Sequence, residues 1–255
     1  MIVKDNRTRE NLIEAGRRLA EVLETLRGRT VPGVTAEELD DLAERLIREG
    51  GDEPAFLGYS PEGAIRPYPA TLCVSVNSEV VHGIPNESRK TLREGDIVSL
   101  DLGLSHEGII VDAAITVPVG RVSDLSKKLL SSTEAALAAG IAKALPGNRV
   151  GDISHAIGET IERAGFAVVK DLGGHGVGDL VHEEPFIPNY GREGSGPLLY
   201  EGMVLALEPI SSAGKAAILL APDGYTYRTR DGSLSAHFEH TILIEKDGPL
   251  VVTRQ

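Results

Sequence analysis

The feature of this sequence that most constrains its fold is an internal repeat. The segment LREGDIVSLDL, residues 92–102, aligns with LYEGMVLALEP, residues 199–209. Both segments begin Leu-x-Glu-Gly, and the alignment sets Asp101 opposite Glu208. A single match of this length arises easily by chance, so a duplication requires further matches in the same order.

Two further matches meet this requirement. GIIVDAAITV aligns loosely with SAHFEHTILI, which sets Asp112 opposite Glu239. VHGIP resembles VHEEP, which sets His82 opposite His182. Three matches in the same order predict that the chain consists of two structurally similar halves.

Each half also begins with a helical pattern, a Pro-Gly turn and a second helical pattern. In the first half the turn is VPGV, and Thr35 and Glu38 form a capping box that starts the second helix. In the second half the turn is LPGN, and Asp152 is the expected N-cap. The apolar stripes of these helices are, in chain order, Leu12, Leu19, Leu23 and Leu26; Leu39, Leu42 and Leu46; Leu130, Leu137 and Ile141; and Ile153, Ile157 and Ile161.

These patterns predict an α+β fold, in which helices cover one side of a curved, largely antiparallel sheet built from both halves. A chain of 255 residues is long enough for one large core. We expect a single domain over residues 1–255, with halves at 1–120 and 121–255.

Composition excludes several classes of function. The net charge of -12 argues against broad binding to nucleic acid or to acidic membranes. Cys73 is the only cysteine, so the chain forms no internal disulfide and no cysteine-rich zinc site. The N-terminal residues are too charged for a secretory signal, and no apolar run approaches the roughly 20 residues of a membrane span. These features indicate a cytoplasmic protein that does not bind membranes.

Asp101, Asp112, Glu208 and Glu239 interrupt apolar, strand-like runs. An unpaired, ionised carboxylate is strongly disfavoured inside such a strand. Outward-facing side chains on a sheet edge, ion pairs with Lys or Arg, and bound metal ions would each relieve this cost. The runs contain no Lys or Arg in their central part, whereas acids occur at matching places in both halves. The repeat therefore favours two divalent cations, which would neutralise four carboxylates.

The stretch GGHGVGDLVHEEP adds two histidines. Its glycines make a helix unfavourable, and in an extended chain an odd spacing puts His175 and His182 on opposite faces. Because oxygen-rich ligation with a single imidazole suits Mn, Fe, Co or Zn in an open catalytic site, we expect His175 to be the nitrogen ligand.

Together the motifs VHGIP, SLDLG, GGHGVGDLVHEEP, LALEP and LSAHFEHTI resemble, in order and spacing, those of the type I methionine aminopeptidases. The resemblance covers nearly the whole chain. It implies the duplicated pita-bread fold of this family and one catalytic domain. It also implies that the protein removes the initiator methionine from nascent polypeptides whose second residue is small.

The resemblance assigns a role to each site residue. Asp101 would bind one metal ion, and His175 and Glu208 would bind the second. Asp112 and Glu239 would bridge the two ions. A water or hydroxide held by the ions would attack the first peptide carbonyl, with Glu208 as general base and then acid. Two other histidines, His82 and His182, would stabilise the transition state.

The resemblance further implies a methionine pocket and two kinds of bound ion. The pocket would be lined by Tyr59, Tyr68, Cys73, His82, Val181 and Tyr225. The divalent pair would be Co, Mn, Fe(II) or Zn, and Asn77 and Ser235 match positions that bind a monovalent cation in some members. Val181, Tyr225 and the long segment 60–67 depart from the usual pattern and affect the expected pocket shape.

Two alternatives remain open at this point. A proline-directed peptidase of the same fold, an aminopeptidase P or prolidase, would share the five metal ligands. A non-catalytic binding protein on this fold would usually have lost some of them. We expect the partners to be nascent chain ends near the ribosome, with no direct nucleic-acid contact, and we expect a monomer.

Overall fold

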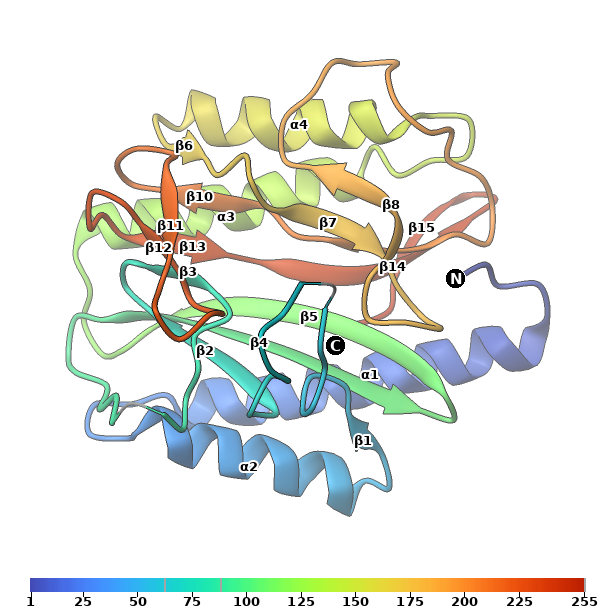
Figure 1. The fold of residues 1–255 in the computed structure, drawn as a ribbon. Coiled ribbons are helices and arrows are strands. Elements are labelled where there is room, and N and C mark those ends of the chain that lie inside the picture. Colours follow the sequence, from blue (N-terminus) through green and yellow to red (C-terminus); the bar gives the residue numbers. More distant parts are fainter. Residues whose placement is uncertain (62, 88, 255) are drawn as a thin grey trace.

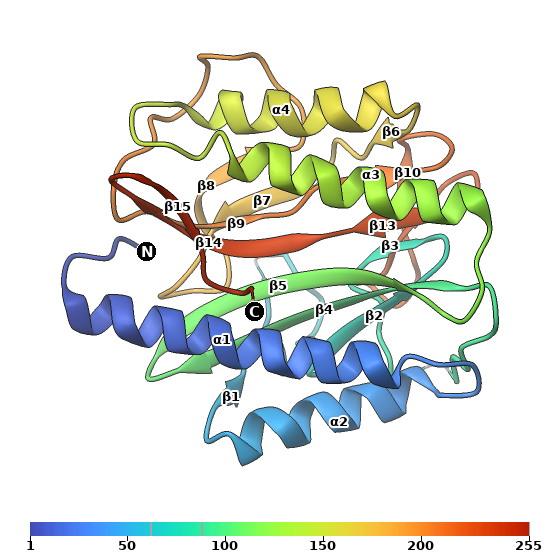
Figure 2. The same cartoon turned by 180° about the vertical axis from the view of Figure 1, so that it is seen from behind.

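The computed structural model describes residues 1–61, 63–87 and 89–254. Its helices are α1 (Asn6–Arg29), α2 (Ala36–Glu49), α3 (Asp124–Ile141) and α4 (Val150–Arg163). The longer strands are β2 (Leu72–Val76), β4 (Ile97–His106), β5 (Ile109–Pro118), β8 (Glu183–Pro188) and β14 (Glu239–Glu245). Figure 1 shows β4, β5 and β14 at the centre of the molecule. Figure 2, the view from behind, shows α1 and α3 crossing in front of the sheet, with α2 and α4 alongside.

The shorter strands complete one large sheet and two small ones. They are β1 (Glu53–Pro54), β3 (Glu79–Val81), β6 (Ala167–Val168), β7 (Gly173–Gly176), β9 (Val204–Leu207), β10 (Ile210–Ser212), β11 (Ile218–Leu220), β12 (Tyr227–Thr229), β13 (Ser235–His237) and β15 (Gly248–Val251). In the described residues the large sheet has nine strands in the order β1-β4-β5-β14-β9-β7-β8, with β2 on β4 and β15 on β14. The small sheets are β13-β10-β6 and β11-β12-β3.

The large sheet joins the two halves of the chain. Strands β4 and β5 come from the first half and β9 and β14 from the second, and β5 pairs with β14 in antiparallel register. Leu100 and Leu102 on β4 pack into the same core as the leucines of α1, so Asp101 between them points to the opposite face. The α+β fold with helices on one side of an antiparallel sheet is therefore confirmed.

The helix starts follow the sequence pattern with one exception. Thr35 caps α2, and its capping box with Glu38 is present. Asp152, in contrast, is not the N-cap of α4: the N-cap is Arg149, and the Asp152 side chain accepts a hydrogen bond from the Arg149 backbone N–H at 2.7 Å. A carboxylate at the third helical position accepts from the amide of the N-cap residue, whereas an N-cap side chain would accept from an amide inside the first turn. None of the helices in the described ranges is long and apolar enough to span a membrane.

Two glycines of α1 provide a matched test of its packing. A Cβ atom at Gly16 would lie 2.1 Å from the carbonyl oxygen of Val252, whereas a Cβ at Gly28 meets nothing within 4 Å. We expect Gly16→Ala to lower the free energy of unfolding by about 1–3 kcal/mol because the helix must move away from the C-terminal segment. Gly28→Ala should instead raise it by up to about 1 kcal/mol. Urea denaturation measures both, and equal effects would show that α1 does not depend on this close approach.

Candidate functional site

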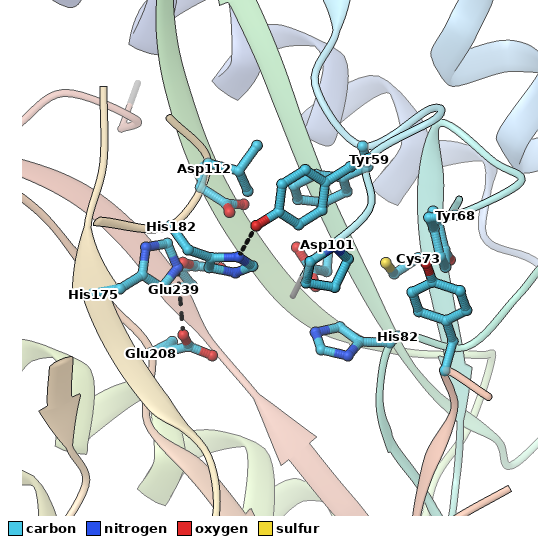
Figure 3. A pocket seen from close by; sticks show the side chains of 14 residues that line it. Tyr59, Tyr68, Cys73, His82, Asp101, Asp112, His175, His182, Glu208 and Glu239 are labelled. Atoms are coloured by element: carbon cyan, nitrogen blue, oxygen red, sulfur yellow. Dashed lines mark hydrogen bonds and ion pairs between the residues drawn. The ribbon is translucent and has the colours of Figure 1, made fainter. Parts of the chain in front are cut away.

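The sequence-predicted site residues meet in one pocket on the face of the sheet opposite α1. Figure 3 shows Asp112, His175, His182, Glu208 and Glu239 at one end of this pocket and Tyr68 with Cys73 at the other, with Tyr59, Asp101 and His82 between them. The lining residues are Phe56, Tyr59, Pro61, Tyr68, Cys73, His82, Asp101, Asp112, His175, Val181, His182, Glu208, Tyr225 and Glu239. All of the residues expected in the metal, catalytic and methionine-binding sets are among them.

The antiparallel register brings three carboxylates together. Ala114 on β5 is paired with Asp101 on β4 at one side and with Glu239 on β14 at the other. Asp112 lies two residues from Ala114, so its side chain leaves the same face of the sheet. Sequence positions far apart in the chain are thereby fixed as direct and diagonal neighbours on a rigid ladder.

Strands β9 and β7 supply the other two members of the cluster. His175 on β7 is paired with Ala206 on β9. Glu208 lies two residues after Ala206, directly after the end of β9. The His175 Nε2 atom is 3.6 Å from the Glu208 Oε1 atom, an ion-pair distance drawn in Figure 3. One ligand atom each from Asp112, His175 and Glu239 lie within 4.8 Å of one another.

The carboxylates are buried, and among the described residues no Lys or Arg forms an ion pair with Asp101, Asp112 or Glu239. Asp101 is 7% exposed, Asp112 3% and Glu239 2%. One oxygen of each has no hydrogen-bond partner in the described part of the chain. Burial raises the pKa of Asp101 to about 6, and burial with the adjacent carboxylates raises the pKa of Asp112 and of Glu239 well above ordinary values. Unpartnered, converging carboxylate oxygens fit divalent cations.

The first of the two histidines in the glycine-rich stretch has its imidazole orientation fixed by the backbone. The His175 Nδ1 atom is 2.9 Å from the carbonyl oxygen of Gly176. A carbonyl only accepts, so Nδ1 carries the hydrogen and Nε2 keeps a free lone pair directed at the carboxylate cluster. This is the arrangement that a metal-ligating imidazole requires.

The second histidine, His182, is held by a side chain rather than by the backbone. The His182 Nδ1 atom is 2.7 Å from the Tyr59 hydroxyl, which donates to this nitrogen in one tautomer of the ring and accepts from it in the other. Burial lowers the pKa of His182 to about 4, and the ring is neutral at pH 7. His182 is thus held by a hydroxyl from the first half of the chain, whereas His175 is held by a backbone carbonyl.

The expectation that the two histidines face opposite ways is wrong. Their ring centroids lie 4.5 Å apart, with one edge toward the other's face. The extended strand β7 ends at Gly176, and the chain then turns through Gly178, whose φ is +138°, so that alternation does not continue to His182. The two rings differ in their hydrogen-bond partners rather than in the face of the chain that they occupy.

His82 approaches the pocket from the first half of the chain. It follows β3 with a φ of +57°, a left-handed conformation that is uncommon for a residue with a side chain. Burial lowers the pKa of His82 to about 4, so it is also neutral at pH 7. The backbone holds this histidine in an unfavourable conformation with its ring directed at the site, which is typical of functional residues.

The apolar end of the pocket holds the predicted methionine-binding residues. Tyr68, Cys73, Val181 and Tyr225 are buried in one cluster with Phe56. Sequence reasoning missed Phe56 and Pro61, because both lie in irregular segments without a periodic pattern. The segment 60–67 contributes Pro61 to the wall, while Glu62 lies outside the described residues.

Sequence reasoning also missed His237, which lies beneath the cluster. Its Nε2 atom is 3.4 Å from Glu208 Oε2 and 3.7 Å from Glu239 Oε2. Burial alone would raise the pKa of Glu208, but the adjacent His237 imidazole brings it below its ordinary value. A signal was present in SAHFEH, since His237 and Glu239 are two residues apart in an extended segment and share a face.

The two residues expected near a monovalent cation are adjacent. The Ser235 backbone N–H donates to the Asn77 carbonyl oxygen at 2.9 Å. The Asn77 side chain bridges Asp96 and the Ile97 backbone, and the Ser235 hydroxyl donates to the Ser211 carbonyl at 2.9 Å. The structure thus joins strands of both halves at this point.

Comparisons with known proteins agree with this geometry. Residues 10–246 match metallopeptidase family M24. The methionine aminopeptidase of Aquifex aeolicus is 46% identical over 246 residues, which cover 96% of this chain and 95% of the relative. The crystal structure of methionine aminopeptidase from Thermotoga maritima has a TM-score of 0.94 and 42% identity, with 100% of each chain covered. The prolidase from Pyrococcus furiosus has a TM-score of 0.75 at 22% identity, with 100% of this chain and 66% of that chain covered.

Fold, site and sequence match together define a metallopeptidase, and the chain belongs to family M24. Within that family it groups with the methionine aminopeptidases, which match it over nearly its whole length. The likeness to prolidase extends to the fold alone. The predicted family and pita-bread fold are confirmed, and the chain is a hydrolase that acts with divalent metal.

Asp112→Asn tests the electrostatic cost of the cluster. The change removes one buried negative charge at nearly constant volume. In protein treated with a chelator, at about pH 7.5, we therefore expect the free energy of unfolding to rise by about 1–3 kcal/mol. Because the pKa of Asp112 is raised in the folded state, folded wild type takes up a proton there as the pH falls and is stabilised by it. The difference in unfolding free energy between the variant and wild type should therefore shrink toward about pH 5. Urea denaturation gives both values. Asp41→Asn, at an exposed position of α2, is the control and should change stability by less than about 0.5 kcal/mol.

Proposed function

We propose that this protein removes the N-terminal methionine from polypeptides whose second residue is small. The observation that carries the proposal is a single pocket that is apolar at one end and ends at the buried carboxylate cluster. Such a pocket binds an unbranched apolar side chain beside a metal-dependent hydrolytic centre. The names of the Aquifex and Thermotoga relatives support the same activity.

We assign two divalent ions to the cluster. Asp101, with Asp112 and Glu239 as bridging ligands, would hold one ion, and His175 and Glu208 would complete the coordination of the other. The free Nε2 lone pair of His175 and the unpartnered oxygens of the described carboxylates support this set. Such ligands accept Co, Mn, Fe(II) or Zn. When bound, the ions would supply an activated water and polarise the substrate carbonyl.

The protein's own groups then move the proton and stabilise charge. Glu208, held ionised by His237, would accept the proton of the attacking water and return it to the leaving amine. His182 would donate its Nε2 hydrogen to the oxygen that becomes negative in the transition state. The neutral ring of His82 would assist the same oxygen from the other half of the chain.

The aromatic end of the pocket would select methionine. Tyr59, Tyr68, Cys73 and Tyr225 surround an apolar space of the kind that suits a thioether. Val181 lies in the same apolar cluster and would help to set the shape of this space. Asn77 and Ser235 would place carbonyl oxygens around a monovalent cation that stabilises the junction between the halves.

We further propose that the substrates are nascent chain ends near the ribosome and that the protein acts as a cytoplasmic monomer, without direct nucleic-acid or membrane contact. The net charge of -12 supports the lack of nucleic-acid contact. We treat residues 1–255 as one catalytic domain because the site draws ligands from both halves.

Peptide hydrolysis tests the proposed function against its closest alternative. Purified protein supplied with Co, Mn or Fe(II) should release methionine from Met-Ala-Ser and should leave Ala-Pro peptides intact. Chelation should abolish the activity and added metal should restore it, since the ions activate the nucleophile. Hydrolysis of Ala-Pro in preference to Met-Ala-Ser would identify a proline-directed peptidase instead. A lack of turnover on both would favour a binding protein.

The two adjacent histidines give a second, independent test. His175→Ala should lose bound metal together with activity, whereas His182→Ala should keep its metal and lose on the order of 10²-fold in kcat, the effect of one oxyanion donor. Elemental analysis of the purified variants measures the metal, and Met-Ala-Ser hydrolysis measures the rate. Equal metal loss in both variants would show that their roles are wrongly divided.

A further inference from the structure

The α-ammonium group of Met1 lies against the segment Val177–His182, which we call the His182 loop. Its nitrogen donates to the Val177 carbonyl oxygen at 3.1 Å and forms an ion pair with Glu183. The Met1 side chain is 5% exposed and that of Glu183 17%. Water screens such a pair poorly, so removing one partner leaves a charge in a site that cannot solvate it well.

The same Glu183 carboxylate also holds the turn of the His182 loop. Its Oε1 atom accepts the backbone N–H groups of Asp179 at 2.7 Å and Leu180 at 2.9 Å. Bonds from a carboxylate to backbone N–H groups are charge-assisted and stronger than neutral ones. One side chain thus connects the start of the chain to the two residues that precede Val181 and His182.

Met1 packs against the His182 loop as well as pairing with Glu183. A Cβ atom at Gly178 would lie 2.4 Å from the Cβ of Met1, so the Met1 side chain fills the space beside this glycine. The Val204 N–H donates to the Met1 carbonyl oxygen at 3.2 Å, and the Val177 N–H donates to the Val204 carbonyl at 3.3 Å. The first residue is thus bonded to the start of β9, beside the end of β7 from which the loop departs.

We propose that the α-ammonium of Met1 is a positioning group for the reaction. Through Glu183 it holds the His182 loop so that Val181 faces the pocket and His182 reaches the substrate. This inference rests on the proposed function, which gives His182 its role. It requires that Met1 be retained, and the second residue agrees: Ile2 is β-branched and too bulky for an enzyme that needs a small second residue.

Two changes remove the interaction from opposite sides. Adding Gly-Ser ahead of Met1 replaces the ammonium by a neutral amide N–H, and Glu183→Gln removes the negative charge with little change in size. The matched controls are Gly-Ser added after the last residue and Asp179→Asn, an exposed side chain of the same loop. Intact mass of wild type first establishes that Met1 is present.

For both changes we expect kcat on Met-Ala-Ser to fall on the order of tenfold while KM stays within about twofold, because a displaced His182 affects the transition state more than binding. Metal content should equal that of wild type. Amide hydrogens of the His182 loop should exchange faster, and the combined variant should be no slower than either single variant, since both remove one interaction. The controls should match wild type.

Wild-type kcat and exchange in both variants would overturn the proposal. So would additive losses in the combined variant, or losses that follow metal content or the fraction of unfolded protein. Loss of Met1 from wild-type protein would overturn it as well. If wild type fails to cleave Met-Ala-Ser, the proposed function fails, whereas the hydrogen-exchange comparison still decides whether the ammonium holds the loop.

Discussion

The mutual repulsion of buried carboxylates is the constraint on which the rest of this structure depends. Asp101, Asp112 and Glu239 leave one face of a continuous antiparallel ladder, and in the described residues no Lys or Arg pairs with them. Only a rigid framework holds like charges together in a site of low dielectric. The apolar cores on the helical side of the sheet supply that framework, so the strands that carry the carboxylates are well packed on their other face.

A hydrogen bond at the Nδ1 atom holds each of the two neighbouring imidazoles, His175 and His182. His175 donates its Nδ1 hydrogen to a backbone carbonyl and keeps a free lone pair on Nε2, whereas the Nδ1 atom of His182 is bonded to the Tyr59 hydroxyl. The two rings are 4.5 Å apart and chemically identical as side chains. The two rings therefore differ in their surroundings, since one bonds to the next residue of its own strand and the other to a side chain from the first half of the chain.

The pocket lies where the two halves of the chain meet, and neither half contains a complete site. The first half supplies Asp101, Asp112 and most of the aromatic wall, and the second supplies Glu208 and Glu239 with two of the histidines. The chain's first residue also reaches the second half, through Glu183. In this duplicated fold the site residues therefore lie at the junction of the two halves, and each half supplies part of the pocket lining.

The sequence by itself determined the duplication, the helix–turn–helix pairs and the identity of the buried acids, because repeat matches, apolar stripes and charges in apolar runs are local signals. It did not determine that His182 would turn back toward His175, that Arg149 rather than Asp152 would cap α4, or that Phe56 and His237 belong to the site. Those outcomes depend on a positive-φ turn and on strand register between distant segments. Only tertiary structure decides them, since the interactions that favour them form between residues far apart in the chain.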